Sequence, residues 1–114
     1  MKRLLLFTAV LAFSALACGG GSKDFSGCVD VTVDAVEGGS IVVDVYGTAV
    51  NACSEHVRYA KVIATCYTSS GAVVARDEEY VEDLDPGQSK TFDALVSDEG
   101  QQTSRCSVTV EEAR

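Results

Sequence analysis

Residues 57–75, VRYAKVIATCYTSSGAVVA, decide the fold that we expect for this chain. Small apolar residues fall on one face of an extended strand over residues 58–68: Ala60, Val62, Ala64 and Cys66. Larger apolar residues fall on the opposite face: Tyr59, Ile63 and Tyr67. A strand with two apolar faces is typical of the interior of a protein. Ser69-Ser70-Gly71 then predicts a tight turn, after which the chain returns over residues 72–81.

The sequence on both sides of this hairpin shows apolar residues at a period of two, which indicates further strands. We expect them at residues 29–33, 41–50, 90–96 and 105–111. Residues 37–40 predict a turn, and Asp85-Pro86-Gly87-Gln88 has the pattern of a type II turn. Gly47, inside a strand, predicts a bulge or a close approach by another element. Six or seven short strands predict an all-β fold, an antiparallel immunoglobulin-like β-sandwich.

The charge of the chain limits its partners. The whole sequence of 114 residues carries a formal charge of -8. Residues 1–17 contribute Lys2 and Arg3 and no acid, so the rest of the chain carries -10. Such a surface repels nucleic acid, and we expect no nucleic-acid partner.

The first seventeen residues predict a signal peptide. Met1-Lys2-Arg3 is a short basic start, and residues 4–17 form an apolar segment of 14 residues. A transmembrane helix needs about 20 apolar residues, so this segment is too short to span a bilayer. A basic start, a short apolar core and small residues at its end are typical of a secretory leader.

Ala15-Leu16-Ala17-Cys18 resembles the lipobox of bacterial lipoproteins, whose cysteine becomes an acylated N-terminus. It departs from that pattern at Ala15, where leucine is usual, and at Leu16, where a smaller residue is usual. The resemblance implies lipid attachment, of the palmitate type, at Cys18 and a membrane partner through that anchor. It places the protein in the bacterial cell envelope, and Gly19, in place of aspartate, implies the outer membrane. The alternative is an ordinary secretory signal followed by a chance cysteine.

After the lipobox, residues 18–27 are rich in glycine and serine and predict a flexible tether. The folded domain then occupies residues 28–114.

One pattern within this domain resembles a known family, the FxLYD-type domain, over about residues 41–96. It consists of Val45-x-Gly47-x-Ala49-x-Asn51, Val62-x-Ala64-x-Cys66-Tyr67, Gly71, Leu84-x-Pro86-Gly87 and Phe92. That family is an immunoglobulin-like sandwich common in bacterial lipoproteins. Ala64 and Cys66 replace the motif's Phe and Leu, and Thr68 replaces its Asp. The smaller core residues suggest that a disulfide fills the space. The resemblance implies an interaction or structural role outside the cytoplasm and no catalytic residues.

The folded domain has four cysteines: Cys28, Cys53, Cys66 and Cys106. An even number in an exported chain predicts disulfides, and three pairings are open. We favour Cys28–Cys53, at adjacent strand ends, and Cys66–Cys106, which share a core-facing parity. A symmetric turn at Gly38-Gly39 would place Cys28 opposite residue 49, so the first pair needs a bulge, for which Gly47 is the candidate, or a looser turn.

The sequence also contains candidate metal-binding and catalytic residues, and each has a simpler interpretation. Cys53-x-x-His56 has the spacing of a zinc-ligand pair, but no second close-spaced pair accompanies it, and we expect no metal and no cofactor. One group of acids has two interpretations, a calcium site or an exposed solubilising face: Asp77, Glu78, Glu79, Glu82, Asp83 and Asp85. These acids lack the loop spacing of a calcium motif, so we favour the exposed face. With one histidine and no nucleophile elbow, we expect no enzyme.

The sequence thus predicts a membrane-tethered, extracytoplasmic lipoprotein whose β-sandwich is a binding or envelope-structural module. An alternative is an accessory subunit that docks on a larger envelope complex, with an envelope protein partner that the sequence does not name. Its contact face would be Tyr59, Ile63 and Tyr67. Packing of these three side chains under a neighbouring strand or edge loop is the simpler explanation, and we favour it.

Overall fold

A computed structural model describes residues 23–114. A single turn of 3-10 helix, Ser26–Cys28, precedes six strands. The strands are β1 (Val29–Gly38), β2 (Val42–Asn51), β3 (Val57–Tyr67), β4 (Val73–Leu84), β5 (Ser89–Ser97) and β6 (Arg105–Ala113). The expected signal peptide, Cys18 and the first part of the tether lie outside the described residues.

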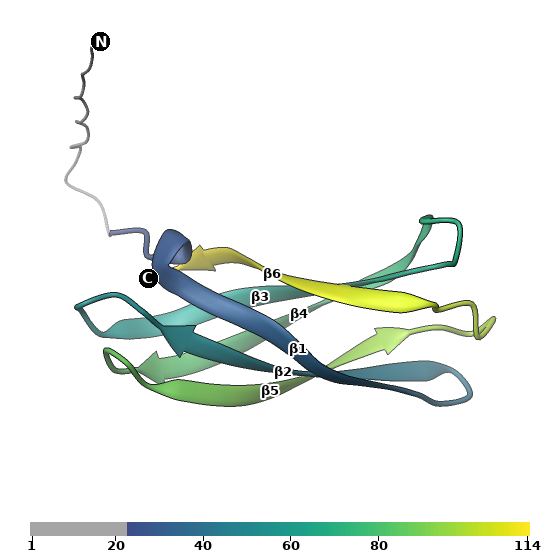
Figure 1. The fold of residues 1–114 in the computed structure, drawn as a ribbon, viewed down its shortest axis with the longest axis horizontal. Coiled ribbons are helices and arrows are strands. Elements are labelled where there is room, and N and C mark those ends of the chain that lie inside the picture. Colours follow the sequence, from purple (N-terminus) through teal and green to yellow (C-terminus); the bar gives the residue numbers. More distant parts are fainter. Residues whose placement is uncertain (1–22) are drawn as a thin grey trace, which may run out of the picture.

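The strands form two sheets that pack face to face (Figure 1). One sheet has the order β1-β2-β5 and the other β4-β3-β6, and every pairing is antiparallel. The predicted all-β sandwich of antiparallel strands is therefore confirmed, with six strands. The chain enters and leaves the fold at the same end, because the Phe25 N–H donates to the Ala113 carbonyl oxygen at 2.8 Å. We call this the tether end.

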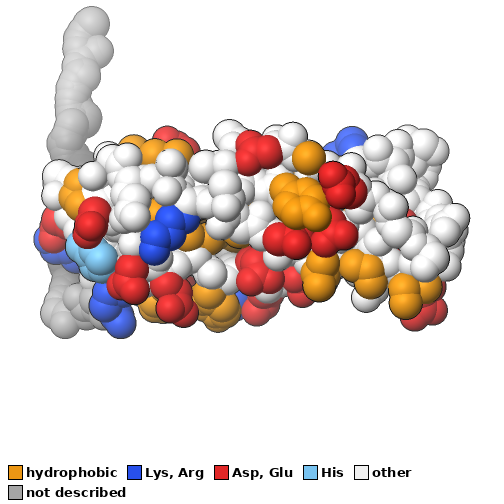
Figure 2. Space-filling model, turned by 90° about the horizontal axis from the view of Figure 1, so that it is seen from below, with side chains coloured by type: hydrophobic (Ala, Val, Ile, Leu, Met, Phe, Trp, Pro, Cys, Tyr) orange, Lys and Arg blue, Asp and Glu red, His pale blue; other side chains and the backbone are white. Residues whose placement is uncertain are grey.

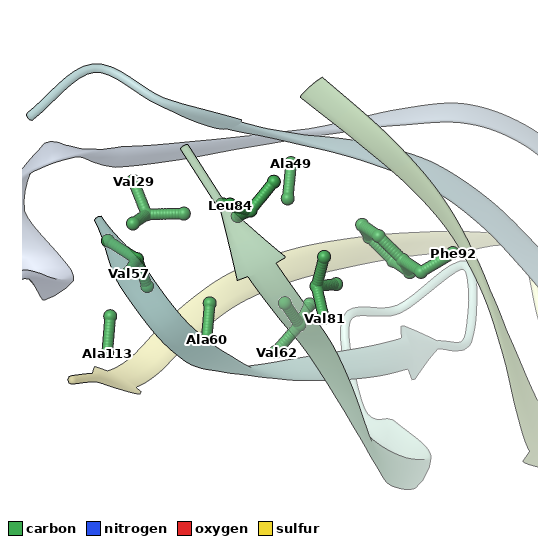
Figure 3. Close-up of a cluster of buried hydrophobic side chains, with 9 residues drawn as sticks. All are labelled: Val29, Ala49, Val57, Ala60, Val62, Val81, Leu84, Phe92 and Ala113. Atoms are coloured by element: carbon green, nitrogen blue, oxygen red, sulfur yellow. The ribbon is translucent and has the colours of Figure 1, made fainter. Parts of the chain in front are cut away.

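β3 is the central strand of its sheet, as its two apolar faces predict. Its inward residues are fully buried: Ala60, Val62, Ala64 and Cys66. The core they face divides into two clusters along the sandwich. The cluster drawn in Figure 3 contains the bulkier side chains, including Leu84, Val57 and Phe92. The second cluster is built of smaller ones: Val43, Val45, Ala64, Cys66, Ala94 and Val96.

Gly47 is required by the close packing of Phe92 across β2 and β5, which pair at these two residues. A Cβ atom on Gly47 would clash with the Phe92 ring and would lie 2.5 Å from the Thr32 carbonyl oxygen. The close-approach interpretation of this glycine is confirmed. The alternative, a bulge in β2 at Gly47, does not occur, since the extra residue of the register shift lies in β1 between Val33 and Ala35.

The turn between β1 and β2 is looser than a symmetric Gly38-Gly39 turn. Gly38 pairs with Val43, and the Gly39 N–H donates to the Val42 carbonyl oxygen at 2.8 Å. This moves the centre of the turn toward residue 41 and brings Val29 opposite Asn51. Ile41, which we placed in a strand, instead lies in the turn and is 58% exposed.

The predicted turn at residues 85–88 carries the chain from one sheet to the other. Gly87 has φ 79°, and the Gln88 N–H donates to the Asp85 carbonyl oxygen at 2.9 Å. Positive φ at the third residue is the requirement of a type II turn, so this prediction is confirmed. The turn also fixes β4 and β5 as neighbours in different sheets.

We predict that Gly47→Ala lowers the free energy of unfolding by about 2 kcal/mol or more, because the new methyl group meets both a core ring and rigid backbone. Urea denaturation followed by circular dichroism measures the change. Gly38→Ala is the matched control, since a Cβ there has no neighbour within 4 Å and the residue has no positive φ. Equal stabilities of the two variants would contradict the close packing of Phe92 on Gly47.

Candidate functional site

Two disulfides staple the sandwich, in the pairing that the sequence favours. Cys28 pairs with Cys53, with Cα atoms 5.3 Å apart, and Cys66 pairs with Cys106, with Cα atoms 4.0 Å apart. The first joins the start of β1 to the loop after β2, where the Ala52 N–H also donates to the Cys28 carbonyl oxygen at 2.8 Å. It lies at the tether end, at the point where the chain enters the fold.

The second disulfide links the central strand to its neighbour. Cys66 and Cys106 are directly opposite each other in the β3–β6 pairing, and Cys66 is fully buried. It lies in the cluster of small core residues, beside Ala64 and Val108. The sulfur atoms therefore occupy core space that small side chains leave between the sheets.

Asn51 organises the loop that carries Cys53, a role that the sequence analysis missed. Its side chain is fully buried, and its amide donates to the carbonyl oxygens of Glu55 and Leu84, both at 2.9 Å. Its side-chain oxygen accepts the Cys53 N–H at 2.8 Å. An asparagine two residues before a cysteine at a strand end is the local signal for such a turn.

The candidate metal ligands do not converge. Cys53 is held in a disulfide, and the ring nitrogens of His56 contact Asp85 at 2.8 Å and Asp83 at 3.5 Å. The acids of β4 alternate: Glu78 pairs with the outward Ile63, and Glu79 with the inward Val62. Among residues 23–114, no group of three or more metal-ligating side chains gathers. The same residues contain no helix long and apolar enough to cross a membrane.

The outer face of β3 is covered by the domain's own polar side chains. Ile63 is only 4% exposed, although it points away from the core. The Tyr59 hydroxyl donates to Glu112 at 2.5 Å, and the Tyr67 ring lies 4.2 Å from the Arg105 guanidinium. The apolar atoms of the row Tyr59, Ile63 and Tyr67 therefore pack within the domain.

Lys61 forms ion pairs with two acids on this same face. Its ammonium lies 2.8 Å from Glu111 and 3.5 Å from Glu78, and its side chain is 19% exposed. The hydrogen bond to Glu111 raises the pKa of Lys61 far above its ordinary value. The one positive charge at the centre of the face thus balances one of the two carboxylates, Glu78 and Glu111.

Asp98 fixes the loop between β5 and β6. It is 4% exposed, and its two carboxylate oxygens accept the N–H groups of Gln102 at 2.8 Å and Thr103 at 2.9 Å. The Gln102 N–H contributes most to lowering the pKa of Asp98. The ionised carboxylate is therefore the form that holds this loop.

A different arrangement holds along the open side of the sandwich between β4 and β5. Three acids gather there, and we call them the acidic seam: Asp77, Glu79 and Asp93. Partial burial, followed by the charges of Asp77 and Asp93, raises the pKa of Glu79. Partial burial, followed by the charge of Asp44, also raises the pKa of Asp93. Glu79 is therefore repelled by the two other acids of the seam, and Asp93 by Asp44 of β2.

No protein-family model matches this chain, and no curated protein and no solved structure matches it either. The comparisons thus identify no family. The fold and the site are therefore assigned from this chain's own residues.

We predict that removing either disulfide destabilises the domain, by about 3–4 kcal/mol in the free energy of unfolding. Cys66→Ala/Cys106→Ala should cost more than Cys28→Ala/Cys53→Ala, because it opens a longer loop and also leaves a cavity around the fully buried Cys66. Urea denaturation under non-reducing conditions measures both. Peptide mapping of the parent protein is the control, and linked peptides in any other pairing would overturn the assignment.

We predict opposite effects for two aspartates. The folded pKa of Asp98 is lowered below 3.8, so its stabilisation is complete above that value and is lost as pH falls through the folded pKa. The folded pKa of Asp93 is raised above 3.8, so its destabilisation is complete above the folded pKa and disappears below the unfolded value. Asp98→Asn should therefore lower the melting temperature at pH about 7, and Asp93→Asn should raise it.

Melting curves across the acid range test this pair, since both differences from the parent protein should shrink toward pH about 3. A decrease in melting temperature for Asp93→Asn at neutral pH would contradict the repulsion between Asp93 and Asp44.

Proposed function

We propose that this protein is a membrane-tethered, extracytoplasmic lipoprotein whose disulfide-stapled β-sandwich acts as a binding or envelope-structural module. The observation that carries the proposal is the pair of disulfides, one at the tether end and one in the core. Disulfides persist in oxidising compartments outside the cytoplasm. Together with the expected leader and lipobox, the disulfides support a location outside the cytoplasm, in the cell envelope.

The geometry of the tether end suits an anchored module. The Cys28–Cys53 disulfide clamps the fold ten residues after Cys18, and the Lys23 ammonium pairs with Glu55 at 2.9 Å. A pulling force on the tether therefore acts first on the covalent link to the loop after β2. It reaches β1 only after that link. The turn at residues 39–41 and the loop at residues 98–104 lie at the other end of the sandwich (Figure 1).

The resemblance of residues 41–96 to the FxLYD-type domain belongs to this proposal. Three of its motif positions have structural roles here: Gly47 and Phe92 pack on each other, and Asn51 bridges two loops. Those roles support an interaction or structural module. The resemblance implies no catalytic residues, so we propose a role without catalysis.

We considered docking through Tyr59, Ile63 and Tyr67 as the mode of an accessory subunit. Ile63 is buried, and Glu112 and Arg105 hold the two tyrosines. Docking there would break contacts that the domain already makes, so the proposal places no partner on this row.

We predict that Cys18→Ser moves the protein from the detergent phase to the aqueous phase when it is expressed in a Gram-negative host and partitioned in Triton X-114. The physical reason is the loss of acyl chains, each methylene of which contributes about 0.8 kcal/mol of membrane affinity. Ser22→Ala is the matched control and should stay in the detergent phase. Unchanged partitioning of Cys18→Ser would refute the anchor, and density-gradient separation of the parent protein tests the outer-membrane assignment.

A further inference from the structure

β4 and β5 each have one hydrogen-bonded neighbour among the described strands, and their other edges are unpaired. The two strands follow each other in the chain, lie side by side and belong to different sheets (Figure 1). An unpaired strand edge presents a row of backbone N–H and C=O groups that another strand can complete. One side of the sandwich is thus open to strand addition.

The acidic seam runs along this open side. Asp77 and Glu79 of β4 pair with Ala64 and Val62, which are buried, so these two acids point toward the interior at the strand edge. Asp93 of β5 pairs with Tyr46 and lies on the outer face. The outer face of the β1-β2-β5 sheet is acidic as well, since the charges of Asp44, Asp93 and Glu37 all act on Tyr46. On the face that Figure 2 shows, acidic side chains gather around a hydrophobic one to the right of the centre of the view.

One basic side chain of the described residues reaches across the open side, near the tether end. The basic side chains of the described residues are Lys23, Arg58, Lys61, Arg76, Lys90, Arg105 and Arg114. Lys90 is the only one on the β1-β2-β5 sheet, and its ammonium donates to the Glu82 carbonyl oxygen at 2.7 Å, near the tether end. Arg76 pairs with Thr65, which places it on the outer face of the other sheet. The seam is therefore negative without a described cation to balance it.

A second copy of this chain would not suit the seam. Two copies that paired edge to edge would bring Glu79 and Asp93 of each against the same acids of the other, and inward charges at an edge oppose such pairing. A partner with lysine or arginine side chains would relieve the repulsion instead. Leu95 of β5, which is 54% exposed, lies two residues from Asp93 on the same face and offers an apolar contact beside the charges.

We infer that the free edge of β5 binds an extended, basic segment of an envelope protein by strand addition. Backbone hydrogen bonds along β5 would supply the register. Basic side chains on one face of the added strand would meet Asp93, and those on the other face would meet Asp77 and Glu79. An apolar side chain next along the outer face would cover Leu95. This inference rests on the proposed role as a binding module and names its contact edge and the chemistry of its partner.

The test uses the full mature chain in detergent micelles and a peptide probe of about eight residues, Ser-Arg-Val-Lys-Thr-Arg-Val-Ser, blocked at both ends. Two control peptides accompany it. One carries glutamate at the three basic positions, and the other keeps the sequence but has N-methyl groups on alternate backbone nitrogens. The second control retains the charge and removes the edge hydrogen bonds.

Asp93→Asn/Glu79→Gln removes two charges from the seam. Asp30→Asn/Glu99→Gln removes two charges from β1 and the β5–β6 loop and is the matched control. We expect the seam variant to weaken binding of the basic peptide by at least about tenfold and the control variant by less than about threefold. Both control peptides should bind at least about tenfold more weakly than the probe. Hydrogen exchange should show new protection at alternate amides of β5.

Equal losses in the two protein variants would show that only the net charge attracts the peptide, and would overturn the inference. Undiminished binding of the N-methylated peptide would overturn it too, because strand addition would then play no part. Titration with calcium chloride in place of peptide gives a third outcome. Saturable calcium binding that Asp93→Asn/Glu79→Gln removes, with no peptide binding, would make the seam a cation site. None of these results depends on Cys18, so the inference can fail while the proposed anchor stands.

Discussion

The covalent link between Cys66 and Cys106 is the constraint on which the rest of the sandwich depends. It joins the central strand β3 to β6 at a point where both side chains face the core. The core beside it is built from alanines and valines, which bury little area each. A domain of this size has little stability to spare, and small core residues give less hydrophobic stabilisation than large ones. The disulfide supplies what the side chains do not, and it sets the pairing of β3 on which β4 is then aligned.

Buried polar groups in this protein are few, and each one shapes a loop. Asn51 and Asp98 are the buried polar residues among those described. The Asn51 side chain forms hydrogen bonds with the backbone of the loop that carries Cys53. The Asp98 carboxylate accepts backbone hydrogen bonds from the loop that leads into β6. A buried amide or carboxylate without partners is costly, so these residues hold their loops in one conformation. The two loops lie at opposite ends of the sandwich: the first carries Cys53 itself, and the second leads into β6, which carries Cys106.

The charged side chains are arranged differently on the outer face of the β4-β3-β6 sheet and along the β4–β5 side. On the outer face of the β4-β3-β6 sheet, Lys61 pairs with Glu78 and Glu111, and Arg105 covers Tyr67. Along the open β4–β5 side, desolvation and the charges of Asp77 and Asp93 raise the pKa of Glu79, and desolvation and the charge of Asp44 of β2 raise the pKa of Asp93. Repulsion of this kind lowers the stability of the folded monomer.

The sequence by itself determined the fold class, the positions of most strands, the turn at residues 85–88 and the preferred cysteine pairing. It did so because strand alternation and turn chemistry are local. The alternation of Val29, Val31 and Val33, for example, indicates a buried face without information from any other strand. Tertiary structure alone decided the rest. The bulge lies in β1 between Val33 and Ala35, and the missing Cβ of Gly47 in β2 admits the Phe92 ring. The bridging role of Asn51 depends on Leu84, which is 33 residues away, and the acidic seam joins residues of two strands that never pair. Contacts between distant segments have no period in the sequence, so only packing of the two sheets could reveal them.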